Sequence, residues 1–106
     1  MQIRGGMNEL MRQAARMQRK IEEKKAEVGD HEVTATAVGD KIKVTATYAR
    51  KVTRIEIEPA FLAAEGVELA LDGVCAAVNS ALEAADKAME AEVAKVTGGL
   101  KIPGAV

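Results

Sequence analysis

The residues best suited to binding chemistry in this chain are basic, and they are concentrated near its beginning. Seven of the fifteen Lys and Arg residues lie within the first twenty-five positions, which carry three acidic residues and a net charge of +4. The remaining positions carry eight basic and thirteen acidic residues, for a net charge of −5. This asymmetry indicates a basic docking element on an acidic body. The overall charge of −1 argues against a generic basic nucleic-acid binder.

The spacing of these basic residues places four of them on one helix face. Apolar residues recur every three or four positions, which predicts an amphipathic helix over residues 7–28. The apolar positions are Met7, Leu10, Ala14, Met17, Ile21 and Val28. At about 100° per residue, the side opposite this stripe carries Arg12, Arg16, Arg19 and Lys20. Such a row is suited to binding an anionic polymer, and it is equally typical of an ordinary solvated helix surface.

Side chains for catalysis or metal binding are scarce. The chain has one His, one Cys and one Tyr, and it has no Cys-x-x-Cys spacing or second His to form a metal site. His31 is expected to cap a sheet edge. Cys75 is expected on the buried flank of a helix, where a free Cys usually acts as a small apolar residue. We therefore expect no enzyme activity, no metal and no cofactor.

Length and composition favour a small protein that associates with itself. The 106 residues are expected to form a single domain, 1–106, and one Phe and no Trp leave a modest core. Such a chain gains stability from a partner surface, so we expect a homodimer. The single cysteine, the lack of a long apolar run and the lack of a signal-peptide pattern predict a cytoplasmic protein with no membrane contact.

Alternating apolar and polar residues predict three strands, at about residues 31–38, 41–48 and 52–58. Gly39-Asp40 is expected to form a two-residue type II′ turn between the first two strands. This turn sets a register that pairs Ala37 with Ile42, Ala35 with Val44, and Val33 with Ala46. All of these apolar residues then lie on one face of the sheet, as a half-buried sheet requires.

A second turn, at Ala49-Arg50 or in a longer loop, leads to the third strand. The two-residue turn places Ile55 opposite Val44 and Ile57 opposite Ile42. On the outer face it pairs opposite charges, Lys43 with Glu56 and Lys41 with Glu58. The other basic cluster of the chain lies on this outer face: Lys41, Lys43 and Arg54.

A long helix is predicted over about residues 67–96, after a connector at residues 60–65 that follows Pro59. Thr97-Gly98-Gly99 ends this helix, and a short C-terminal tail follows. The larger apolar residues form one stripe: Val67, Leu71, Val74, Val78, Leu82, Ala85, Met89, Val93 and Val96. An alanine face and an acidic edge flank it: Ala70, Ala77, Ala81, Ala84, Ala88 and Ala91, and Asp72, Glu83, Asp86 and Glu90. We expect Ile55 and Leu82 to be core residues.

The order of these elements, α-β-β-β-α, predicts an α+β fold. A three-stranded antiparallel meander sheet with one apolar face needs a cover, and the two amphipathic helices supply it. The expected architecture is a two-layer α-β-β-β-α sandwich.

Three segments of the chain resemble the YbaB/EbfC family of bacterial nucleoid-associated proteins. The first segment runs from Met7 to Gln18. The second combines Ile42–Thr45 with Ile55–Leu62. The third comprises Ala76–Ala81, and Thr97–Leu100 with Pro103-Gly104 follows it. The three segments occur in the family's order over nearly the whole chain.

The resemblance implies a homodimer of α-β-β-β-α protomers that binds duplex DNA, compacts it and influences gene expression broadly in the nucleoid. In the family, projecting helices form arms implicated in DNA contact. These arms correspond here to residues 12–24, and the candidate DNA-binding residues are Arg12, Arg16, Arg19, Lys20 and Lys24. Phosphate contacts are the simplest expectation, with Asn8 and Gln13 available for base edges.

Two other functions are compatible with the same residues. The chain can be an adaptor that docks an acidic protein partner through its basic helix, or an RNA-binding accessory factor. The near absence of aromatic side chains argues against stacking on single-stranded bases, so duplex DNA is the leading hypothesis.

Overall fold

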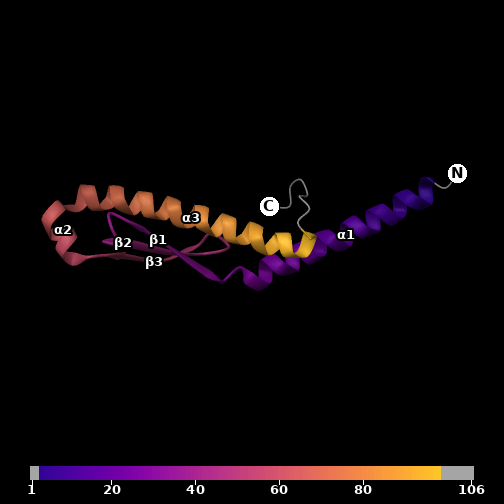
Figure 1. Cartoon of the computed structure of the whole chain (residues 1–106), viewed down its shortest axis with the longest axis horizontal. Helices are drawn as coiled ribbons and strands as arrows, with labels where there is room; N and C mark the ends of the chain where they lie inside the picture. The colour runs from indigo at the N-terminus through magenta and orange to yellow at the C-terminus, as the bar shows by residue number, and fades with distance from the viewer. Residues whose placement is uncertain (1–2, 99–106) are drawn as a thin grey trace.

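The computed structural model describes residues 3–98, which form a sheet layer and a helix layer with one helix projecting from them (Figure 1). The elements are α1 (Ile3–Val28), β1 (Glu32–Ala37), β2 (Ile42–Thr47), β3 (Val52–Ile57), α2 (Pro59–Glu65) and α3 (Val67–Thr97). The strands form one antiparallel sheet in the order β1-β2-β3. This confirms the predicted α+β fold and meander. The predicted C-terminal tail lies outside the described residues.

The pairing of β1 with β2 follows the predicted register, and the turn between them is of a different type. Ala37 lies opposite Ile42, and Ala35 lies opposite Val44. Gly39 and Asp40 have φ values of 56° and 70°, and positive φ at both central residues is the type I′ pattern. The predicted type II′ turn is therefore wrong. Val38, directly before the turn, also has a positive φ of 55°, so β1 ends at Ala37 and the connection comprises residues 38–41.

The turn between β2 and β3 is one residue longer than the two-residue alternative, and a β-bulge restores the register. The N–H of Thr47 donates to the carbonyl of Lys51 at 2.8 Å, so the loop comprises residues 48–50. Arg50 ends this loop in the left-handed region, at φ 69°. The pairing then shifts by one residue, which leaves Thr53 as the extra residue of β3. Beyond the bulge the predicted pairs return: Lys43 with Glu56, Val44 with Ile55, and Ile42 with Ile57.

α3 packs on the sheet through its smallest side chains. Ala70, Gly73, Ala77 and Ala81 are buried in this contact. A Cβ atom at Gly73 would lie only 2.4 Å from Cδ1 of Ile42, so glycine allows the helix to approach this closely. The core beneath it comprises Ile42, Val44, Ala46 and Phe61 together with these alanines.

The larger apolar stripe of α3 lies on a flank of the helix instead of facing the sheet. Val74, Val78 and Leu82 are half-buried and pack against the core. Val67 and Leu71 are 62% and 56% exposed, so the expected burial of the first part of this stripe is wrong. The alanine face takes the central position because small side chains let the helix axis lie closer to the strands.

Residues 60–65 form a helix, where the sequence analysis expected only a connector. α2 begins at Pro59, whose missing N–H is harmless in the first helical turn. Phe61 is buried in the core, and Gly66, at φ 87°, separates α2 from α3. α2 thus reverses the chain from the end of β3 to the start of α3 (Figure 1).

The expectation that both helices cover the sheet is wrong for α1, which packs against α3 instead, and only through its C-terminal half. Ile21 and Val93 are buried at this contact, and Met17, Met89 and Val96 surround them. Every side chain of residues 6–16 is exposed, and we call these residues the arm. The helix begins at Ile3, four residues before the predicted start at residue 7.

The arm makes the molecule elongated, because α1 continues past the end of α3 (Figure 1). The dimensions are 75 × 20 × 17 Å, with a radius of gyration of 20.0 Å. A compact domain of about 100 residues has a radius of gyration of about 13 Å. None of the helices among the described residues has an apolar stretch long enough to cross a membrane.

Candidate nucleic-acid interface

Four of the five candidate DNA-binding residues lie exposed on α1, in the arm and the turn that follows it. Arg12 and Arg16 have side chains that are 66% and 54% exposed. Arg19 and Lys20 are also exposed, and they lie just beyond the arm. Residues 3–98 leave these side chains accessible to a large anionic ligand.

Arg12 and Arg16 share one carboxylate, that of Glu9. Nη1 of Arg12 lies 3.2 Å from Oε2 of Glu9, and Nη2 of Arg16 lies 3.7 Å from Oε1. Gln13 donates from Nε2 to the same Oε1 at 3.4 Å. On this face of the arm, the Glu9 carboxylate is therefore bound by two guanidinium groups and one amide. Asn8, the other polar residue considered for base contacts, is exposed on the arm.

Lys24 differs from the other four candidates in its surroundings. Its side chain is only 24% exposed, and Nζ lies 3.7 Å from Oε2 of Glu27. Lys24 belongs to the part of α1 that packs against α3, one turn beyond the buried Ile21. The Lys24 side chain is therefore less accessible to a ligand than the other four candidate side chains.

The orientation of α1 is set where it meets β1 and the loop between β2 and β3. The N–H of Tyr48 donates to the carbonyl of His31 at 2.8 Å, and the N–H of Ala49 donates to that of Gly29 at 3.1 Å. The rings of His31 and Tyr48 meet edge to face with centroids 5.4 Å apart. His31 thus has a packing position just before β1, near the sheet edge where it was expected. These contacts hold the base of α1 against the sheet.

An ion pair on α3 lies close to the same junction. Nζ of Lys95 donates to Oε2 of Glu92 at 2.8 Å. This hydrogen bond lowers the pKa of the Glu92 carboxyl, with smaller contributions from the charges of Lys95, Lys24 and His31, against the opposing effect of desolvation. The same hydrogen bond raises the pKa of Lys95. Lys24 belongs to α1 and His31 to the segment between α1 and β1, so the charge of Glu92 interacts with the base of α1.

The second basic cluster, on the outer face of the sheet, is compensated by carboxylates. Nζ of Lys41 lies 3.4 Å from Oε1 of Glu58, and Nε of Arg54 lies 3.6 Å from Oε1 of Glu56. Lys43 lies opposite Glu56 in the strand register. The two predicted cross-strand charge pairs are therefore in register, and they leave little net charge on this face.

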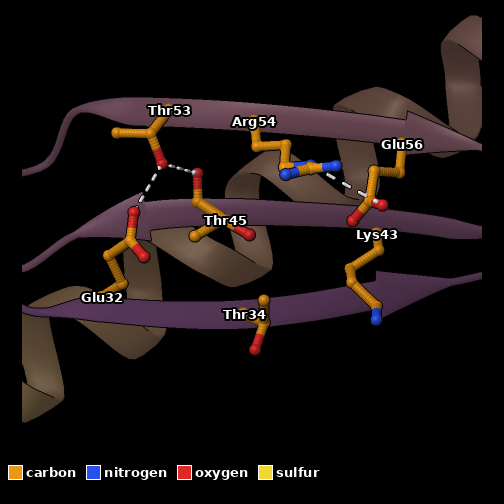
Figure 2. Close-up of a pocket in the computed structure, with 7 residues that line it drawn as sticks. All are labelled: Glu32, Thr34, Lys43, Thr45, Thr53, Arg54 and Glu56. Carbon is orange, nitrogen blue, oxygen red and sulfur yellow. Dashed lines mark hydrogen bonds and ion pairs between the residues drawn. The ribbon is translucent and has the colours of Figure 1, made fainter.

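Figure 2 shows the shallow hollow, of about 560 Å³, that these strands form on the outer face. Its lining is polar: Glu32, Thr34, Lys43, Thr45, Thr53, Arg54 and Glu56. Thr53 donates from Oγ1 to Oε2 of Glu32 at 3.0 Å, so the bulged residue ties two strands together. Because its charges are balanced and partly bonded to each other, this hollow is a weaker candidate for a polyanion than the arm.

The structure also exposes large apolar side chains that the sequence did not predict to lie at the surface. Large apolar side chains in β3, α2 and the start of α3 are 37–62% exposed: Val52, Ile55, Leu62, Val67, Leu69 and Leu71. Ile55 was expected in the core and is 47% exposed, because α3 covers β1 and β2 and hardly reaches β3. Cys75 is exposed as well, so its predicted burial is wrong. Contiguous exposed apolar residues mark interaction sites, and Val67 and Leu71, one helical turn apart, share one flank of α3.

Comparisons with known proteins agree with the sequence resemblance and the fold. The YbaB/EbfC DNA-binding family matches residues 4–100. A nucleoid-associated protein of Clostridium kluyveri is 39% identical over 100 residues, covering 94% of this chain and 88% of the relative. A nucleoid-associated protein of Alkaliphilus metalliredigens is 40% identical over 98 residues, covering 92% of this chain and 86% of the relative.

A solved structure shares the fold at much lower sequence identity. It is the crystal structure of an uncharacterized protein from Helicobacter pylori, which is 14% identical and has a TM-score of 0.61. The similarity covers 74% of this chain and 90% of that one. Given the family match over residues 4–100 and relatives at 39–40% identity, the chain belongs to the YbaB/EbfC DNA-binding family.

Proposed function

We propose that this protein is a non-enzymatic, nucleoid-associated protein that binds duplex DNA as a homodimer, mainly through phosphate contacts. The observation that carries the proposal is the exposed basic face of α1 in a chain of a DNA-binding family. Arg12, Arg16, Arg19 and Lys20 make the principal contacts, and Lys24 adds charge at the edge of the site.

The chemistry of this face favours phosphate over base contacts. Guanidinium groups match the geometry of phosphate oxygens, and such contacts position a protein on DNA without reading its sequence. Few aromatic rings are available for stacking on unpaired bases, because Phe61 is buried and Tyr48 packs against His31. We therefore expect duplex binding with weak sequence dependence.

Two exposed apolar side chains support the homodimer. Ile55 on β3 and Leu71 on α3 are about half exposed in the protomer, and a second copy covers such residues without requiring a different partner. A dimer carries two arms, which can hold two segments of DNA or clamp one. This arrangement would compact DNA in the nucleoid of the cytoplasm and affect the expression of many genes.

A salt titration of DNA binding tests the proposal. Fluorescence anisotropy with several unrelated duplexes should give similar Kd values, each rising steeply with salt. The expected log–log slope is about −0.9 for each phosphate neutralised. No duplex binding at low salt would contradict the proposal and favour an adaptor for an acidic protein. Tighter binding to RNA than to duplex DNA would favour the accessory RNA-binding function.

A further inference from the structure

The arm contains a single acidic residue, and that residue lies on its basic face. Between positions 6 and 16 the sole carboxylate is that of Glu9, and the next acidic residues along α1 are Glu22 and Glu23. Glu9 contacts three of the polar side chains of the arm, those of Arg12, Gln13 and Arg16. The basic face is thus partly occupied by an anion of the chain itself.

Glu9 and Arg16 are farther apart in the sequence than the residues of ordinary ion pairs within a helix. Side chains three or four positions apart are neighbours on a helix, as Glu9 and Arg12 are. Arg16 is seven positions from Glu9, which is a rise of about 10.5 Å along the helix axis. Nη2 of Arg16 nevertheless lies 3.7 Å from Oε1 of Glu9, because its long side chain extends toward the N-terminus of α1. Two guanidinium groups from successive turns therefore converge on one carboxylate.

We propose that the Glu9 carboxylate occupies the position that a DNA phosphate takes between Arg12 and Arg16, and that Glu9 thereby limits the affinity of the arm for DNA. A phosphate group offers the same kind of acceptor as a carboxylate, and it binds guanidinium groups through the same N–H donors. DNA must displace Glu9 from Arg12 and Arg16 before these residues are free to bind. This inference rests on the proposed function, and it assigns to Glu9 the role of an internal competitor.

The variant Glu9→Gln removes the competing charge and keeps the length and helix propensity of the side chain. At low salt, Glu9→Gln should tighten duplex binding about fivefold, since two exposed ion pairs are released and one repulsive charge is lost. The matched control is Glu23→Gln, which changes the net charge equally at an exposed position of the same helix. The control should tighten binding by less than about twofold, because its only contribution is a change in net charge. Far-UV circular dichroism verifies that the helix content is unchanged.

A second background separates this inference from the proposed function. In an Arg12→Ala/Arg16→Ala protein, adding Glu9→Gln should tighten binding by less than about twofold, as the Glu23→Gln control does, because only the net charge then changes. Equal tightening by Glu9→Gln and Glu23→Gln, or no tightening by Glu9→Gln, would overturn the inference while leaving DNA binding intact. Equal binding by the wild type and the Arg12→Ala/Arg16→Ala protein would instead overturn the assigned DNA site.

Heparin–agarose gives a comparison that does not depend on DNA. If Glu9 competes for the arm's guanidinium groups, the Glu9→Gln protein should elute at higher salt than the Glu23→Gln protein. Elution of the two variants at the same salt concentration would contradict the role of Glu9 as a competitor, even if duplex DNA proved not to be the ligand.

Discussion

Val44 and Ile55 lie opposite each other on β2 and β3, but within the part of the chain that the structure describes only Val44 is covered. Val44 is 0% exposed, whereas Ile55 is 47% exposed. The difference arises because α3 lies over β1 and β2, so the apolar face of the sheet continues past the helix onto an edge strand. An uncovered edge strand with apolar side chains is prone to associate with another chain. Covering Ile55 is therefore the main reason to expect a second copy.

The first prediction concerns the dimer. Light scattering at micromolar concentration should give about twice the 11.2 kDa mass of the chain. Ile55→Glu should shift the protein to monomer, because it places a charge in the covered surface. Leu71→Glu, at a residue 56% exposed in the protomer, is an independent second variant. The control is Leu10→Glu, at a residue of the arm that is 64% exposed, and this variant should stay dimeric.

Two results would contradict this assignment of the interface. A monomeric wild type across the micromolar range would remove the basis for a two-armed protein. Ile55→Glu and Leu71→Glu proteins that remain dimeric, with far-UV spectra like the wild type, would place the interface on another surface.

The second prediction concerns backbone strain at Val38. Its φ of 55° lies in the left-handed region, where a β-branched residue is strongly disfavoured. Val38 is 46% exposed and its Cγ2 lies near Gly73 of α3, so some packing is lost on substitution but less than the strain that is relieved. Val38→Asn should stabilise the protein by about 1 kcal/mol, since Asn tolerates this conformation. Urea unfolding at a fixed protein concentration measures the change. Thr34→Asn, within β1, is the control and should destabilise, because Asn is unfavourable in an extended strand.

The third prediction concerns pH. The pKa of Glu92 is lowered from its ordinary value of 4.5, chiefly by the hydrogen bond from Lys95. A carboxyl with a lowered folded-state pKa contributes stability above its unfolded pKa and loses that contribution as the pH falls through the folded value. Glu92→Gln should therefore unfold at a lower temperature than the wild type at pH 7, and the difference should shrink as the pH falls below the ordinary value of 4.5 and through the lowered folded-state pKa. A difference that stays constant down to acidic pH would contradict this origin of the effect.

The strand register was predictable because two features determine it together: the alternation of apolar and polar residues along each strand and the position of the turn. The apolar residues of β1 and β2 share one face only if the turn is at Gly39-Asp40, and a shift by one residue would expose them all. The longer second loop did not disturb the prediction for Ile55 and Ile57, because the bulge at Thr53 compensates for the extra loop residue. The positive φ at Arg50 carried no signal in the sequence, because the residue there is neither Gly nor Asn.

The errors concern how the elements pack, which periodicity does not determine. The pattern of α3 shows an apolar stripe and an alanine face, but only the packed structure shows that the alanine face contacts the sheet. The same limit applies to Ile55, whose exposure depends on which strands α3 covers. α2 carried a local signal, since Pro59 precedes a run of good helix formers and Gly66 follows it.

The sequence predicted which candidate residues share one face of α1, but it did not predict the residues that surround them. Spacing alone placed four cations opposite the apolar stripe of α1, and all four are exposed. The sequence did not show that α3 ends beside Met17, which is why the arm projects without a cover. It also did not show that Arg12 and Arg16 converge on Glu9, because the contact with Arg16 spans seven positions.

The most direct test of the account replaces Arg12, Arg16, Arg19 and Lys20 together by alanine and measures duplex binding across salt concentrations. The fold should survive, because exposed substitutions usually change stability by less than about 0.5 kcal/mol. The control variant, Lys41→Ala/Lys43→Ala/Arg54→Ala, removes the compensated cluster of the outer sheet face.

The fourfold variant should bind all duplexes more weakly, by similar factors, and its salt slope should flatten by about 0.9 for each lost phosphate contact. The sheet variant should bind nearly as the wild type does. Loss of binding at one sequence alone would contradict the phosphate mechanism and implicate Asn8 and Gln13 in base contacts. Unchanged binding by the fourfold variant, with loss in the sheet variant, would contradict the central claim and move the DNA site to the outer face of the sheet.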